Sequence, residues 1–97
     1  MSAEVEEMLK RFQSFKNVIG IIVVDNDGIP IKTTLEYNLT LHYAAVMQSV
    51  REKARQVVLD LDATNEFTFL RLRTLLHEVM LCPQEDYFIV VLQSPSD

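Results

Sequence analysis

Residues 18–34 read Val-Ile-Gly-Ile-Ile-Val-Val-Asp-Asn-Asp-Gly-Ile-Pro-Ile-Lys-Thr-Thr, and this stretch decides the fold. An apolar, β-branched run meets a turn, and a half-polar run follows, which predicts a β-hairpin. Asp27-Gly28 can supply the positive φ values that a two-residue primed turn needs. Because Pro30 has no N–H to donate, it fits a sheet only at an edge, at the start of a strand or at a bulge, and we expect its strand at an edge. The first strand is apolar throughout, which indicates burial on both faces.

The rest of the chain shows helical and strand patterns in turn. Apolar residues recur at spacings of three and four before Asn17 and again over 39–61, which predicts two amphipathic helices. The second helix, of about 23 residues, would be roughly 35 Å long and would extend past its own sheet. Asn38 or Thr40 is its expected N-cap. Strands are expected over about 18–24, 29–34, 66–73, 77–82 and 87–93.

This order predicts an α+β fold in one domain that spans residues 1–97. The economical structure is a five-stranded antiparallel sheet flanked by helices. The two most apolar strands, 18–24 and 87–93, belong in its middle, and 66–73 forms the second edge. An open edge can pair with another chain, which is one interpretation of this strand. The other interpretation is an ordinary edge that Arg71 and Arg73 protect from pairing.

Composition limits the classes of partner. The 97 residues carry a formal net charge of −5, which argues against nucleic acid or an anionic membrane, because both are bound through clustered Lys and Arg. No run of 18 apolar residues occurs, so membrane insertion is not expected. Cys82 is the only cysteine and forms no internal disulfide, which is typical of a reducing cytosol.

Sequence motifs for catalysis or metal binding are weak. Two glycines cannot build a phosphate-binding loop of the usual kinds. Residues 25–28 lack the ligand spacing of a calcium loop. His42 and His77 have no zinc-ligand spacing, and His77 and Cys82 would point to opposite faces of one strand. We therefore expect no catalytic residue, cofactor or metal, and we interpret the chain as a binding module.

Blocks along the whole chain resemble the Roadblock family of cytoplasmic dynein light chains. Their order and spacing along the chain make the resemblance specific. The blocks are Glu4-Val-Glu-Glu-Met-Leu-Lys-Arg11, Gly20-Ile-Ile-Val-Val24, Gly28-Ile-Pro-Ile-Lys-Thr33, Phe67-Thr-Phe-Leu-Arg-Leu-Arg73 and Asp86-Tyr-Phe-Ile-Val-Val-Leu-Gln-Ser-Pro95.

The resemblance implies the Roadblock/profilin-like order α-β-β-α-β-β-β. It also implies a homodimer in which the third strands pair across a two-fold axis and the second helices pack side by side. The implied strand contacts are Phe67, Thr68, Phe69, Leu70, Arg71 and Leu72. The implied helix contacts are Tyr43, Met47, Val50 and Ala54, although these residues are equally suited to covering their own sheet.

The implied function is that of a non-catalytic light chain. Such a subunit binds the dynein intermediate chain and supports cargo attachment in microtubule-based transport, in the cytoplasm and on the cytoskeleton. The alternative is a Roadblock-fold scaffold that regulates a small GTPase. The dimer would form with a second copy or with a paralogue.

One departure from the family lies after the third strand. Dynein members usually carry a basic turn there, whereas this chain has Thr74-Leu75-Leu76-His77. An exposed turn of this kind is an aggregation liability in one interpretation. In the other, Leu75 and Leu76 form a changed partner surface or alter the pairing preference.

Overall fold

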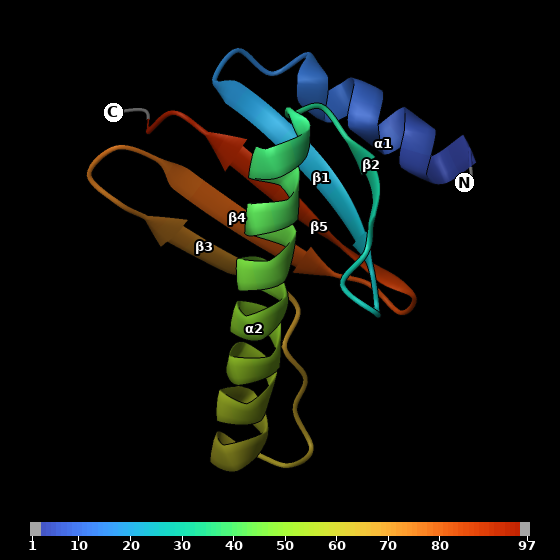
Figure 1. Ribbon diagram of the computed structural model, residues 1–97. Coiled ribbons are helices and arrows are strands. Elements are labelled where there is room, and N and C mark those ends of the chain that lie inside the picture. Colours follow the sequence, from blue (N-terminus) through green and yellow to red (C-terminus); the bar gives the residue numbers. More distant parts are fainter. Residues whose placement is uncertain (1–2, 96–97) are drawn as a thin grey trace.

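The computed structural model describes residues 3–95 and confirms the predicted order of elements (Figure 1). The described residues form two helices and five strands, so the fold is α+β. The elements are α1 (Ala3–Gln13), β1 (Val18–Asp25), β2 (Pro30–Thr33), α2 (Tyr37–Leu61), β3 (Leu70–Arg73), β4 (Glu78–Pro83) and β5 (Tyr87–Gln93).

The strands form one antiparallel sheet in the order β2-β1-β5-β4-β3. The apolar strands β1 and β5 pair along their length, from Val18 opposite Gln93 to Asp25 opposite Tyr87. The predicted interior strands and both predicted edges, β2 and β3, are therefore confirmed.

The sheet separates two layers of core, as the continuous apolar runs predict. On one face Ile22, Val90 and Leu81 pack with Met47 of α2. On the other face Ile21, Ile89 and Val91 pack with Val5 and Leu9 of α1. Successive side chains of a strand point to opposite faces, so Ile21 and Ile22 serve different layers although both are buried.

The turn between β1 and β2 differs from the predicted primed turn. Gly28 has a φ of +85°, but no non-glycine residue of the described range has a positive φ. The Gly28 N–H donates to the Asp25 carbonyl, and the Asp25 N–H donates to the Ile29 carbonyl. The loop is therefore a three-residue connection with glycine at its left-handed position. Asp25 Oδ1 also accepts from the backbone N–H groups of Asp27 and Ile29, which favours this longer loop.

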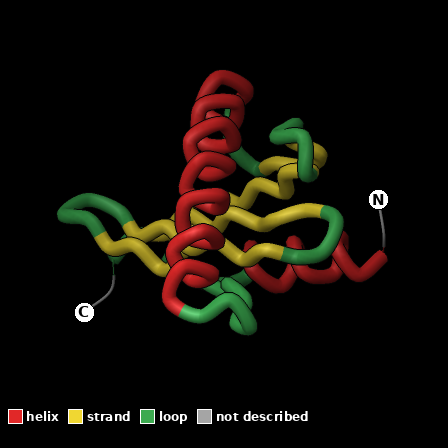
Figure 2. The backbone as a smooth tube through the Cα atoms, turned by 90° about the horizontal axis from the view of Figure 1, so that it is seen from below, coloured by secondary structure: helices red, strands yellow, loops and turns green. Residues whose placement is uncertain are grey.

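Helix α2 begins earlier than predicted and has a different cap. Glu36 is the N-cap, and its carboxylate accepts from the backbone N–H groups of Asn38 and Leu39. Neither Asn38 nor Thr40 takes this role. The C-terminal end of α2 stands clear of the strands in both views (Figures 1 and 2), as its predicted length requires.

Strand β3 is shorter than predicted. Regular pairing with β4 covers only Leu70–Arg73, and residues 65–69 have no strand or helix assignment. The predicted alternation therefore fails at Phe67, which packs with Leu70 against the α2-side core instead of sharing the opposite face with Phe69 and Arg71. The physical reason is that Phe67 covers part of its side chain in the core between the sheet and α2, which removes apolar surface from water.

Candidate functional site

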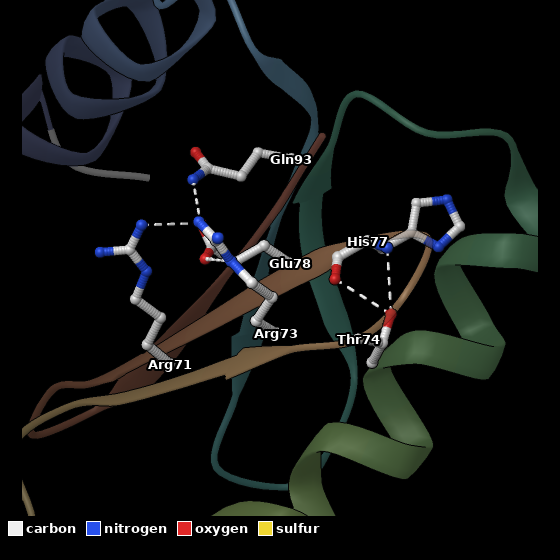
Figure 3. A network of polar contacts seen from close by, with 6 residues as sticks. All are labelled: Arg71, Arg73, Thr74, His77, Glu78 and Gln93. Carbon is white, nitrogen blue, oxygen red and sulfur yellow. Dashed lines mark hydrogen bonds and ion pairs between the residues drawn. The ribbon is translucent and has the colours of Figure 1, made fainter. Parts of the chain in front are cut away.

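The edge strand β3 carries two arginines that meet a buried carboxylate of β4 (Figure 3). Arg71 Nη2 lies 2.9 Å from Glu78 Oε1, and Arg73 Nε lies 3.0 Å from Glu78 Oε2. Gln93 of β5 donates to the same carboxylate. The side chain of Glu78 is only 1% exposed, whereas both arginines are about half exposed. These four residues, called the Glu78 cluster below, tie the edge strand to the sheet.

The Glu78 cluster favours the charged form of its carboxylate. The hydrogen bond from Arg71 lowers the pKa of Glu78 most strongly, and Gln93 and Arg73 lower it further. Burial acts in the opposite direction, and the resulting pKa is about 2, compared with an ordinary value of 4.5. Glu78 is therefore ionised throughout the physiological pH range.

The turn after β3 holds Leu75 and Leu76 out into solvent. Thr74 donates from its backbone N–H and its hydroxyl to the His77 carbonyl, at 2.7 and 3.0 Å. The His77 N–H donates back to Thr74 Oγ1 (Figure 3). Leu75 is 93% exposed and Leu76 is 72% exposed. These two residues, called the leucine tip below, are thus an apolar knob on a hydrogen-bonded turn.

An apolar stripe runs along one flank of α2. Its members recur at spacings of three and four over the length of the helix, and four of them have large exposed side chains: Leu39, Val46, Val57 and Leu61. Tyr43 and Val50 also belong to the stripe and are half-buried against the core, and Ala54 completes it.

The opposite flank of α2 is polar. Arg51 donates to Asn26 Oδ1 and to the Gln84 carbonyl, both at 3.0 Å, and its guanidinium lies 5.3 Å from the centre of the Phe88 ring. Val57 lies about 160° around the helix from Arg55 on this flank. Arg51 therefore fixes α2 to the turns at one end of the sheet, and the stripe faces away from them.

A cleft of about 610 Å³ lies on the polar flank. Its walls come from α2, from the segment 65–68 and from the turn after β4. The ladder between β3 and β4 stops at the pair Leu70–Leu81, because the chain before Leu70 leaves β4 to pack Phe67 beneath α2. Pro83, at the end of β4, has no N–H with which to continue the ladder. The cleft occupies the space between the diverging segments.

A family model for the Roadblock/LC7 domain matches residues 4–94. The chain belongs to the Roadblock/LC7 family. The solved structures share its fold at low sequence identity. A Roadblock/LC7 domain from Streptomyces avermitilis is 12% identical with a TM-score of 0.80, over 91% of this chain and 73% of that one. The sheet and helices described above are therefore those of a Roadblock fold.

Two further solved structures of similar fold come from Myxococcus xanthus. The protein MglB is 15% identical with a TM-score of 0.78, over 95% of this chain and 76% of its own. The protein MglC is 16% identical with a TM-score of 0.56, over 99% and 82%. An MglB structure with a tetrameric arrangement has a TM-score of 0.78 at 10% identity, over 97% and 75%. At these identities the likeness establishes the fold.

The Roadblock fold places the predicted dimer residues in different surroundings. Leu72, Phe69 and Arg71 are exposed at or beside the β3 edge, as is Thr68. Phe67, Leu70, Tyr43 and Val50 are half-buried against their own core, and Ala54 is also partly covered. Met47 is 4% exposed within that core, so it offers almost no surface to a second chain.

The helical apolar pattern of the sequence includes Val57 and Leu61, but the implied dimer contacts on α2 do not include them. Leu39 and Val46, which are also exposed on the stripe, were not part of the pattern. The spacing of three and four from Tyr43 and Val50 reaches both of them. The Glu78 cluster was also missed, although a glutamate in an apolar strand is itself a signal that a cationic partner is near.

The described residues contain no group of three or more His, Cys, Asp or Glu side chains suited to a metal ion. Cys82 packs in the α1-side core, and burial raises the pKa of its thiol, which lowers the fraction of reactive thiolate. Within residues 3–95 no helix is long and apolar enough to cross a membrane.

Proposed function

We propose that this Roadblock protein is a non-catalytic docking subunit that acts as a homodimer. The observation that carries the proposal is the coincidence of an open edge strand, β3, with the exposed apolar stripe of α2. An unpaired edge can hydrogen-bond to the same strand of a second copy. A two-fold axis through that edge makes each α2 approach its counterpart, and the stripe supplies apolar surface for the contact.

The dimer presents a composite surface to a third protein, and two partner classes are supported by different observations. The proteins MglB and MglC of Myxococcus xanthus share the fold, and their names mention no dynein. They support a general scaffold role, and for this chain we propose a platform that regulates a small GTPase. The sequence blocks quoted above support the second candidate, a dynein light chain that binds the intermediate chain on the cytoskeleton of the cytoplasm.

The two candidates predict different binding behaviour. A GTPase platform binds its partner with an affinity that depends on whether the GTPase holds GDP or GTP. A dynein light chain binds a segment of the intermediate chain without any nucleotide dependence. Both require the dimer, because both use a surface that two copies form together.

A titration against small GTPases in each nucleotide state, and in parallel against intermediate-chain peptides, separates the candidates. The disruptive control is Val46→Lys, which places a charge in the exposed part of the stripe and leaves the core untouched. We expect the Val46→Lys variant to be monomeric. One partner class should then bind the wild-type dimer and should not bind this variant. Equal binding to dimer and monomer would contradict a composite surface. Formation of a mixed dimer with a paralogue in preference to the dimer of two identical copies would contradict the homodimer.

A further inference from the structure

The two walls of the cleft carry opposite charges. Arg51 and Arg55 of α2 line one wall, and Glu66 and Glu85 lie on the segment before β3 and on the turn after β4. The segment before β3 runs beside the lower half of α2 (Figure 1). Within residues 3–95, neither arginine forms an ion pair with either glutamate. The charges therefore line a common space of about 610 Å³ and do not pair across it.

The charge of Arg51 has only neutral partners in the part of the chain that the structure describes. Its guanidinium donates to Asn26 Oδ1 and to the Gln84 carbonyl, and it lies 5.3 Å from the centre of the Phe88 ring. Arg51 is half-buried, and a cation withdrawn from water is normally paired with an anion. This wall of the cleft is therefore suited to an anionic group of another molecule.

Arg55 adds a second, more accessible cation one turn further along α2. It lies 3.4 Å from Glu52, and the side chains are 57% and 73% exposed. An exposed ion pair of this kind contributes little, so Arg55 can exchange Glu52 for another carboxylate at small cost. A doubly charged phosphate is disfavoured, because Glu66 and Glu85 on the opposite wall repel it. A carboxylate with a basic neighbour satisfies both walls.

The position of the cleft suits an extended segment. The ladder between β3 and β4 stops at the pair Leu70–Leu81, so the end of β4 at Pro83 has no β3 residue beside it. Adjacent side chains of an extended segment point to opposite sides. An acidic residue directed at the α2 wall therefore directs the next residue at the glutamates. Leu59 and Phe67 supply apolar surface for the stems of such long side chains.

We propose that the cleft binds an extended segment of a partner protein in which an acidic residue and a basic residue are adjacent. The acidic side chain pairs with Arg51 and Arg55, and the basic side chain pairs with Glu66 or Glu85. The volume of the cleft is typical of ligand sites, which span roughly 300–1,000 Å³. One chain forms the whole cleft, so this site goes beyond the proposed function and does not need the dimer.

A pair of eight-residue peptides tests the charge pattern. The probe alternates glutamate and lysine, and its matched control has the same composition, as four glutamates followed by four lysines. The amide resonances of Glu66 and Thr68 report binding to the full chain by nuclear magnetic resonance. About 0.1 M salt screens attraction beyond roughly 10 Å. We expect the alternating peptide to bind about fivefold more tightly than the block peptide, which is the effect of one exposed ion pair.

Substitutions inside and outside the cleft test the site. Arg55→Gln should raise the dissociation constant of the alternating peptide about fivefold, because one exposed ion pair is lost. Lys53→Gln is the matched control, since it removes the same charge from the same helix about 160° away around the axis. It should leave the constant unchanged. The leucine tip follows the other end of β3, so Leu75→Ser/Leu76→Ser should also leave the constant unchanged.

Three results would overturn the proposal. Equal binding of the two peptides, or equal weakening by Arg55→Gln and Lys53→Gln, indicates general attraction without a site. Tighter binding of inorganic phosphate than of the alternating peptide indicates a simple anion site. Light scattering on the same samples reports the dimer separately. A dimer that binds no peptide overturns the cleft proposal alone, whereas a monomer that binds the alternating peptide supports the cleft and overturns only the homodimer.

Discussion

The two edge strands of the sheet, β2 and β3, are equally short but are held in different ways. β2 is connected to both helices: Lys32 Nζ lies 2.8 Å from Glu6 Oε1 of α1, and Thr33 Oγ1 lies 2.8 Å from Thr40 Oγ1 of α2. β3 is held on the α1 side by Glu78 of the neighbouring strand, and the described α1-side core contains no residue of β3. The edge strand β2 is therefore tied to both helical layers, whereas β3 is held mainly by its own sheet.

The backbone of β2 also makes this edge unsuited to pairing with another strand. Pro30 lacks an N–H, and the register between β1 and β2 shifts between Val23 and Val24. The β3 ladder runs without a shift from Leu70 to Arg73. The comparison therefore predicts that matched substitutions at the two edges have unequal effects on association.

The largest expected effect comes from a charge at the open edge. Leu72 and Ile31 are 44% and 46% exposed, so Leu72→Asp and Ile31→Asp are a matched pair. We expect Leu72→Asp to raise the dissociation constant of the dimer about 100-fold or more, because apolar burial is lost and a charge is placed in the paired edge.

Ile31→Asp should leave the dimer constant unchanged. Sedimentation equilibrium measures both constants. Equal weakening by the two variants would show that the edges do not differ in the proposed way.

A smaller effect tests how the closed edge is attached. A Cβ at Gly20 of β1 would overlap the side chain of Leu35, which follows β2 and packs on the α2-side core. We expect Gly20→Ala to lower the free energy of unfolding by about 1–3 kcal/mol through overpacking. Urea denaturation measures the change.

The double variant Gly20→Ala/Leu35→Ala is the control for the Gly20 prediction. It removes the overlap, so its cost should be smaller than the sum of the two single costs. Strict additivity would argue against the contact.

The carboxylates that hold each edge give a comparison that depends on pH. Glu78 has a pKa of about 2 in the folded chain, below its ordinary value of 4.5. Its stabilisation is therefore complete above the unfolded-state pKa and is lost as the pH falls from about 4.5 toward 2. We expect Glu78→Gln to lower the thermal midpoint at neutral pH and to flatten its decline over this acidic range.

Glu6→Gln is the control at the β2 edge. The hydrogen bond from Lys32 lowers the pKa of Glu6 too, but this pair is exposed and screened by solvent. Its neutral-pH midpoint should therefore change less than that of Glu78→Gln. Thermal unfolding followed by circular dichroism at neutral and acidic pH makes the comparison, and an equal change in both variants would contradict it.

The sequence predicted the fold well because β1 and β5 are apolar on both faces, a pattern that fits only interior strands. Pro30 identified one edge for a local reason, its missing N–H. The turn at 25–28 was predicted incorrectly, because the carboxylate of Asp25 accepts two backbone N–H groups and favours a longer loop. This competing side-chain interaction is not visible in the pair Asp27-Gly28 alone.

The candidate site was less predictable, because its surfaces depend on tertiary packing. The block 67–72 identified the open edge, but alternation could not show that Phe67 turns beneath α2 and leaves a cleft behind it. The helix periodicity identified both Met47, which is buried in the core, and Val57, which is exposed, and it could not tell them apart. One flank of α2 is exposed because the helix extends past the sheet. The sequence does not show where along α2 the cover of the sheet ends.

The molar mass in solution tests the central claim most directly. The chain mass is 11.2 kDa, and light scattering coupled to size exclusion at tens of micromolar should give twice that value. The same measurement on Leu72→Asp should return the mass of a single chain. A wild-type protein that stays at 11.2 kDa at this concentration would contradict an open edge that pairs with its own copy.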